Sequence, residues 1–393
     1  MIKKKIENLI IKEIEIKIKN FFRKKKFNLH EPSFFGNEKK YLNECIKSSY
    51  VSSVGDYVNK FEKKISDYTK SKYSLSVING TSALHLTLLA ANINKNDEVL
   101  VQSLTFVASV NPILYCGAIP HFVDVENETL GIDPIKLERY LENISIIKNK
   151  KCINKNTKRK ISALIVMHTF GHPSKIIQLK KICRKFNIIL IEDAAEAIGS
   201  FYKNKHVGTF GDFGVLSFNG NKTITSGCGG MILTNNYKFY KKIKHLSTQS
   251  RVKHKFEFIH DEIGYNYRLS NINAAVGFAQ LEYINKILRS KRQIFNIYKV
   301  LFSNQSFFTV FKEPIYSKSN YWLQTILLND EYIEYKNVII SKLNDSGINV
   351  RPVWKPIHLL KYFKKSPKMN LYNTNLLYKK IINLPSSYSL IIK

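Results

Sequence analysis

Short apolar runs alternate with stretches of helical periodicity through much of the chain. The apolar runs that are typical of buried strands are residues 75–78, 99–102, 122–123, 161–167 and 188–191. The stretches with helical spacing between them are residues 84–91, 107–115 and 176–186. Strands separated by helices indicate βαβ units, and therefore an α/β fold with a mostly parallel sheet and helices on both faces. The pattern predicts that this sheet is complete by about Thr234.

The pattern changes on both sides of this α/β region. Residues 1–27 alternate Ile with Lys and Glu, which predicts a partly amphipathic helix packed on the main body, with a membrane-surface anchor as the alternative. Charged, helix-compatible sequence at 237–304 is suited to a long connection, and strand-like residues 321–328 and 348–353 flank a helical stretch at 335–345. The predicted divisions are a basic helical extension at 1–27, a large α/β domain at 28–250, a connecting and dimer-contact segment at 251–305, and a small α+β domain at 306–393.

The size and composition agree with a folded protein of two domains. The 393 residues exceed the roughly 250 to 300 residues that one hydrophobic core supports. Hydrophobic residues make up 44% of the chain and aromatic residues 12%, which excludes a wholly disordered protein. Because no run approaches the roughly 20 apolar residues of a membrane span, we expect neither a transmembrane segment nor a signal peptide.

The net charge of +32 does not by itself indicate a nucleic-acid-binding protein. Only nine of the 62 basic residues are arginines, and the lysines run from Lys3 to Lys393 with mild clusters at 24–26 and 155–160. A/T-rich coding explains such a composition, and a selected polyanion-binding surface is the alternative. Nucleic-acid binders normally gather arginine on one element, so we expect no nucleic-acid partner. The positive field still attracts phosphorylated substrates.

The cysteines predict neither disulfides nor a metal site. They are odd in number and form no C-x-x-C pair, which excludes a disulfide framework and a zinc site. Their positions are Cys45, Cys116, Cys152, Cys183 and Cys228. Free thiols are typical of a reducing compartment, so the expected location is the cytoplasm.

Three segments carry candidate chemistry. Residues 188–191 form a strand with Glu192 and Asp193 at its carboxyl end, where open α/β sheets place ligands, although an ordinary helix cap is the alternative. A second strand leads to Ser217 and to Lys222, in a loop that lacks the spacing of a phosphate-binding P-loop.

The third segment is a turn between a strand and a helix. Gly80 turns the chain, and Thr81 and Ser82 open a helix whose free N–H groups make an anion site, unless the hydroxyl groups only cap the helix. One ligand satisfies all three segments, because it has a phosphate, a protonated ring nitrogen for a carboxylate, and a carbonyl that reacts with lysine. That ligand is pyridoxal 5′-phosphate.

With these residues in view, the chain resembles the fold-type I, pyridoxal-phosphate-dependent sugar-nucleotide aminotransferases of the DegT/DnrJ/StrS family. The matching motifs stand in family order across about residues 28–393. They are NGTSAL at 79–84, LTFVA at 104–108, EDAAE at 192–196, SFNGNK at 217–222, GYNYR at 264–268 and RPVW at 351–354. The motifs that resemble the branch acting on UDP- or GDP-linked 4-keto-6-deoxy-N-acetylhexosamines, which serves legionaminic acid and bacillosamine synthesis, are HEP at 30–32, SSVG at 52–55, CINK at 152–155 and HTFGHP at 168–173.

The resemblance implies a role for each matching residue. Lys222 binds the cofactor aldehyde as a Schiff base, Asp193 keeps the ring nitrogen protonated, and Phe106 stacks on the ring. The other implied cofactor contacts are Thr81, Ser82 and Ser217 at the phosphate, Glu196 beside the 3′-oxygen, and Asn266 from the partner subunit of a homodimer with a shared active site. The implied substrate-binding residues are Arg268, Arg351, Trp354 and His358.

The activity that follows is transfer of an amino group from L-glutamate to the C4 ketone of a nucleotide-linked sugar for surface glycans. No metal is expected. Two readings from other classes remain: a non-catalytic regulator on the same fold, and a basic protein that binds nucleic acid or a membrane surface. An amino-acid desulfurase is less favoured, because no cysteine lies in an evident flexible loop away from Lys222.

Overall fold

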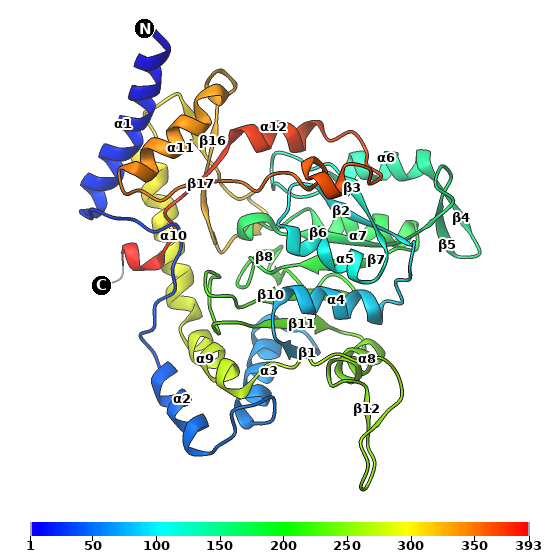
Figure 1. Ribbon diagram of the computed structural model, residues 1–393. Coiled ribbons are helices and arrows are strands. Elements are labelled where there is room, and N and C mark those ends of the chain that lie inside the picture. Colours follow the sequence, from blue (N-terminus) through cyan, green and yellow to red (C-terminus); the bar gives the residue numbers. More distant parts are fainter. Residues whose placement is uncertain (1, 392–393) are drawn as a thin grey trace.

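The computed structural model describes residues 2–391 and has a large α/β body joined to a smaller α+β body (Figure 1). The strands of the large sheet are β1 (Tyr73–Val77), β2 (Glu98–Gln102), β3 (Ile119–Val123), β4 (Ser145–Lys148), β5 (Lys151–Asn154), β6 (Lys160–Met167), β7 (Ile189–Asp193), β10 (Phe213–Ser217) and β11 (Gly230–Thr234). Their order along the sheet is β1-β11-β10-β7-β6-β2-β3, and the β4–β5 hairpin continues from the start of β6.

The sheet is mostly parallel, as the sequence predicts. From β10 to β3 every neighbouring pair is parallel, and β11 runs antiparallel to both β1 and β10. The central strands are buried along their whole length, which explains why they are continuous apolar runs and not alternating ones. The carboxyl ends of β7 and β10 therefore lie at one edge of the sheet, and this edge carries the site.

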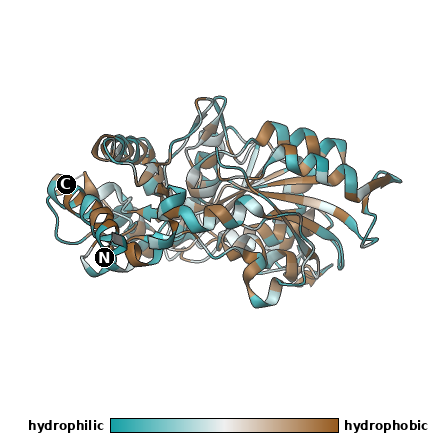
Figure 2. Cartoon of the chain, turned by 90° about the horizontal axis from the view of Figure 1, so that it is seen from above, coloured by the Kyte–Doolittle hydropathy of each residue, from teal (hydrophilic) through white to brown (hydrophobic). Residues whose placement is uncertain are grey.

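Helices cover both faces of the sheet, and successive strand residues contact opposite layers. Leu190 of β7 packs with the layer that contains α3, α6, α7 and α9, and Ile191 packs with the layer of α4, α5 and α8. Figure 2 shows the apolar strands enclosed between helices that turn polar residues outward. These helices are α3 (Asp56–Thr69), α4 (Gly80–Ala90), α5 (Asn111–Tyr115), α6 (Pro134–Ile144), α7 (Ile176–Lys185), α8 (Tyr237–Ser247) and α9 (Asn271–Glu282).

The smaller body is built on an antiparallel sheet of order β14-β16-β18-β17. Its elements are α10 (Ile284–Leu301), β14 (Phe308–Val310), β16 (Gln324–Leu328), α11 (Lys336–Asp345), β17 (Arg351–Pro352), α12 (Tyr372–Lys380) and β18 (Ile381–Leu384). The predicted strand at 348–353 forms regular pairs only in β17, because Ile348 instead bridges to Phe27 of the N-terminal segment.

The N-terminal helix α1 (Ile2–Phe22) lies along α11 (Figure 1). Its residues Ile10, Ile14 and Ile18 are fully buried in a cluster with α10 and α11, so the predicted amphipathic helix packs on the protein itself. Within residues 2–391, no helix is both long and apolar enough to cross a membrane.

The sequence predicted none of three further features of the described chain. A helix α2 (Glu38–Lys47) precedes α3, and a hairpin of β12 (Arg251–Val252) and β13 (Ile259–His260) interrupts the charged stretch at 237–304. In Figure 1 this hairpin projects away from the body. A small sheet of β8 (Phe201–Tyr202), β9 (Lys205–His206) and β15 (Ser317–Lys318) joins the two bodies.

Candidate active site

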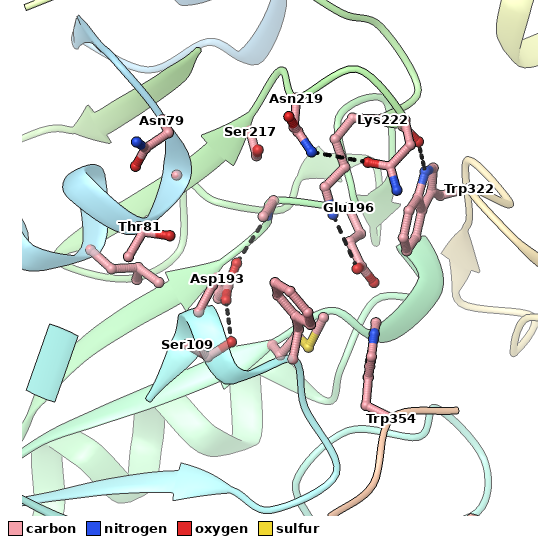
Figure 3. Close-up of a pocket in the computed structure, with 17 residues that line it drawn as sticks. Asn79, Thr81, Ser109, Asp193, Glu196, Ser217, Asn219, Lys222, Trp322 and Trp354 are labelled. Atoms are coloured by element: carbon pink, nitrogen blue, oxygen red, sulfur yellow. Dashed lines mark hydrogen bonds and ion pairs between the residues drawn. The ribbon is translucent and has the colours of Figure 1, made fainter. Parts of the chain in front are cut away.

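A cavity of about 210 Å³ opens where the carboxyl ends of β7 and β10 meet the start of α4 (Figure 3). The predicted residues that line it are Thr81, Phe106, Asp193, Glu196, Ser217, Lys222 and Trp354. Residues from β1–α4, β7, β10 and the small body thus meet at one point, although they are far apart in the sequence.

Asp193 is the last residue of β7 and is buried. One of its carboxylate oxygens accepts a hydrogen bond from Ser109 Oγ at 2.6 Å, and the other accepts one from the Ala195 N–H at 3.1 Å. Ser109 is in turn 2.7 Å from the hydroxyl of Thr105. These bonds fix the carboxylate beside the cavity, where a buried anion favours a cationic ligand group.

Lys222 stands in the loop between β10 and β11, opposite Asp193 (Figure 3). Its Nζ lies 3.2 Å from Glu196 Oε1 and 4.1 Å from the centre of the Trp322 ring. The other oxygen of Glu196 accepts a hydrogen bond from the Phe170 N–H at 2.9 Å. Burial raises the pKa of Glu196 to about 7, and Lys222 opposes this shift. The amine therefore faces a buried carboxyl group whose pKa lies near neutral pH.

The other end of the cavity is the turn that leads into α4. The Asn79 side chain caps α4 by accepting from the Ser82 N–H at 2.8 Å, and the first-turn N–H groups of Gly80 and Thr81 have no partner within a helix. A Cβ on Gly80 would lie 3.1 Å from Ser217 Cβ, so the missing side chain is what lets this turn approach β10. Hydroxyl groups, N–H groups and the positive end of a helix together suit a phosphate.

Three aromatic rings, those of Phe106, Trp322 and Trp354, form the remaining wall. Phe106 is half-exposed in the cavity, and its ring centre is 6.1 Å from that of Trp354. Phe170 lies behind them, 5.1 Å from Trp354 and 6.5 Å from Trp322. Phe106 thus has a free face that a flat heteroaromatic ring can cover.

Several predicted residues lie outside the cavity of this single chain. Ser82 contributes its N–H to the Asn79 cap. Arg268 is paired with Glu62 at 3.0 Å and donates to the Ser76 carbonyl at 3.2 Å. Asn266 and Arg351 are exposed, and His358 Nδ1 is 2.7 Å from Ser103 Oγ. Their roles at the cofactor or substrate stay predictions.

Glu192 and Asp193 are adjacent acids, but their side chains have different surroundings. The Glu192 side chain is on the opposite face of β7 from Asp193 and is fully buried. Its oxygens accept from the N–H groups of Gly208, Phe210 and Gly211 at 2.6–2.7 Å, and His168 lies 3.1 Å away. Glu192 therefore fixes the loop before β10, and Asp193 serves the cavity.

Sequence reasoning missed three contributors to the site: Ser109, Asn320 and Trp322. Trp322 comes from the small body and lines the cavity, and Asn320 supports it from behind through Glu196 and Trp322. Both depend on how the small body docks on the large sheet, so no local pattern indicates them. Ser109 lies in a stretch for which the sequence predicts a helix. The 3-10 turn Val107–Ser109 in that stretch directs the Ser109 side chain at Asp193.

Comparison with known proteins gives a consistent result. The DegT/DnrJ/EryC1/StrS aminotransferase family matches residues 34–391. A GDP-perosamine synthase of Escherichia coli O157:H7 is 40% identical over 92% of this chain and 93% of its own. A UDP-4-amino-4,6-dideoxy-N-acetyl-β-L-altrosamine transaminase of Campylobacter jejuni is 32% identical over 90% of each chain. The structure of Helicobacter pylori PseC, an aminotransferase involved in the biosynthesis of pseudoaminic acid, has a TM-score of 0.85 and 26% identity, and the match covers 94% of this chain and 95% of that one.

Proposed function

The chain belongs to the DegT/DnrJ/EryC1/StrS aminotransferase family, whose enzymes depend on pyridoxal phosphate, and we propose that it transfers an amino group from L-glutamate to the C4 ketone of a nucleotide-linked 6-deoxy sugar. The observation that carries this proposal is the convergence of Lys222, Asp193 and the Gly80–Thr81 turn on one cavity. A lysine, a buried carboxylate and an anion-binding turn are the three contacts that this cofactor needs.

The residues of the cavity fit the cofactor at each end. The α4 turn and the hydroxyl groups of Thr81 and Ser217 would hold the phosphate, and the carboxylate of Asp193 would accept from a protonated ring nitrogen. Phe106 would cover one face of the ring. Lys222 would bind the aldehyde carbon covalently through Nζ.

The chemistry divides between the cofactor and the chain. When bound, pyridoxal phosphate supplies an electron sink, which accepts the electron pair released when the Cα–H bond of the amino acid breaks. Asp193 strengthens this sink, because its negative charge favours the protonated ring nitrogen. Lys222, once its amine is free, moves the proton between carbon atoms as a general acid and base, a step worth roughly 10²- to 10⁴-fold. Reversal of the same steps on a ketone gives ping-pong kinetics.

The comparisons support a nucleotide-linked sugar as the amino acceptor, and they favour a GDP-linked sugar over a UDP-linked one. The 40% identity to GDP-perosamine synthases of Escherichia coli and Vibrio cholerae favours a GDP-linked sugar. The 32% identity to the Campylobacter transaminase, whose name specifies a 4-amino-4,6-dideoxy-N-acetyl sugar on UDP, supports the C4 position and keeps a UDP-linked N-acetylhexosamine as the second candidate.

A homodimer with a shared active site is part of this proposal. The hairpin that projects from the body carries exposed Phe256 and Phe258, and Ile263 beside it is also exposed. Exposed apolar groups of this kind typically mark a protein contact. A second copy that covers them would also give Asn266, which follows the hairpin, a place at its neighbour's cofactor.

The test uses purified protein, pyridoxal phosphate and glutamate labelled with ¹⁵N at the amino group. Each member of a panel of GDP- and UDP-linked 4-keto-6-deoxy sugars, with and without an N-acetyl group, is offered as acceptor. Mass spectrometry should find the ¹⁵N in an amino sugar formed from one of the GDP-linked ketones at the highest rate. Absence of label from every sugar in the panel would refute the proposal, and the Lys222→Arg protein gives the background.

A further inference from the structure

Trp322 covers the amino group of Lys222 from the side of the small body. The Lys222 side chain is 13% exposed, so water solvates its ammonium group poorly. A cation that leaves water needs charged or aromatic partners. Two are present, namely Glu196 Oε1 at 3.2 Å and the Trp322 ring, whose centre lies 4.1 Å from Nζ.

Three hydrogen bonds from three segments fix the position of Trp322. Its indole N–H donates to the Asn221 carbonyl at 2.7 Å, and its backbone N–H donates to Asn320 Oδ1 at 2.8 Å. Its backbone carbonyl accepts from Lys291 Nζ at 2.9 Å. The indole plane therefore has a set orientation relative to the loop that carries Lys222.

Asn320 connects Trp322 to Glu196, the other partner of the Lys222 amine. Its side-chain N–H groups donate to the backbone carbonyl of Glu196 at 2.8 Å and contact Thr223 Oγ1 at 3.1 Å. The buried amide of Asn320 thus links Thr223, Glu196 and Trp322. A Cβ on Gly171 would come within 1.8 Å of Asn320 Oδ1, so the fold leaves the space that this amide needs.

The other basic groups near Trp322 do not compete for its ring. Lys291 contacts the Trp322 carbonyl and not the ring face, and burial lowers its pKa well below the ordinary value. The His30 ring is tilted at 6.4 Å from that of Trp322, and burial, followed by the charges of Lys291 and Lys222, also lowers its pKa well below the ordinary value. Lys222 is therefore the cation that the ring face receives.

We propose that Trp322 is a positioning residue that, together with Glu196, holds the free amino group of Lys222 whenever that group is not bound to the cofactor. The inference rests on the proposed function, in which the amine must leave the cofactor, move a proton and return. An aromatic face stabilises an ammonium group without a hydrogen bond, so of the two partners only Glu196 has a hydrogen bond that must break when the amine moves.

The test measures covalent capture of pyridoxal phosphate by cofactor-free protein as a function of pH. Capture requires the uncharged amine, and the absorbance of the lysine-bound aldehyde gives its rate. Trp322→Leu removes the ring, whereas Trp322→Phe keeps an aromatic face and loses the indole N–H. The Lys222→Met protein gives the baseline, and circular dichroism shows that each variant is folded.

Because the ring stabilises the ammonium form, its removal should move the midpoint of capture to lower pH by about 0.5 to 1 unit in Trp322→Leu. The shift in Trp322→Phe should be less than half as large. An unchanged midpoint in the Leu variant would overturn the inference, and so would equal shifts in both variants, which would assign the effect to the indole hydrogen bond. Failure of the native protein to capture the cofactor would instead defeat the proposed function.

Discussion

The two walls of the cavity come from different bodies of the protein and are built in different ways. The large-body wall consists of residues at the ends of regular elements: Asp193 ends β7, Ser217 ends β10 and Gly80 begins α4. The small-body wall consists of Trp322 and Trp354, with Asn320 behind them. All three lie outside the strands of the small body and are held by hydrogen bonds and ring contacts to the large body.

This difference indicates a division of labour. The large-body wall contains the charged groups to which we assign the chemistry, and its geometry follows from the parallel sheet. The small-body wall contains neutral groups that contact the amine of Lys222 or residues beside it. Loss of Lys222 or Asp193 from the first wall should therefore abolish chemistry, and changes in the second should alter how well the amine is placed. Four substitutions test this distinction.

The largest effect is expected for Lys222→Arg. A guanidinium keeps the positive charge, but it neither binds an aldehyde carbon stably nor releases a proton near neutral pH. Turnover should fall by at least the roughly 10²- to 10⁴-fold of a lost general acid and base. The absorbance band of the lysine-bound cofactor should disappear in the same protein. Persistence of that band would show that another residue binds the aldehyde.

Asp193→Asn should be the next most damaging change. The amide is nearly the same size and can still contact Ser109, but it no longer favours a protonated ring nitrogen. The variant should retain the cofactor and lose about 10²- to 10³-fold in turnover, the scale of one preorganised electrostatic contact. Single-turnover kinetics with glutamate measure this loss. Near-normal turnover would remove Asp193 from the reacting wall.

The two walls also differ in how far the sequence predicts them. Asp193 ends one strand and Lys222 follows the end of another, Ser217, by five residues. A parallel sheet brings such strand ends together, so local pattern suffices. Trp322 stands beside a strand too, but its place over Lys222 depends on how the small body docks. Asn320 contacts Glu196 across 124 positions of sequence, and no local signal encodes such a pair. The predicted role of Asn266, whose side chain is exposed, also has no local signal, because that role needs a second chain.

Asn320→Ala tests whether the small-body wall acts by placement. The substitution leaves the Glu196 carbonyl and the Trp322 N–H without their partner, which should cost about 1 to 3 kcal/mol of stability. Turnover should fall about tenfold, a modest loss for a misplaced catalytic group. Urea unfolding and steady-state kinetics measure the two effects.

Asn383→Ala is the matched control for this change. Asn383 is equally buried in β18 and accepts from Thr325 Oγ1 at 2.8 Å, but it belongs to the interior of the small sheet and not to the cavity. It should also lose stability, because Thr325 is left without this partner, and it should keep normal turnover. Equal losses of turnover in both variants would mean that Asn320 acts only through general stability.

Glu196→Gln should have the smallest effect on turnover and a characteristic dependence on pH. Burial raises the pKa of Glu196 from 4.5 to about 7, so between these values the folded protein binds a proton that the unfolded chain has released. Folding of the native protein then becomes less favourable as pH rises through this window, by up to about 3 kcal/mol, whereas the amide has no such dependence. In cofactor-free protein, the urea midpoint of the Gln variant relative to the native one should rise from pH 4.5 to 7 and level off above that. A difference that is constant with pH would show that Glu196 does not titrate there, and that the amine of Lys222 rests against a permanent carboxylate.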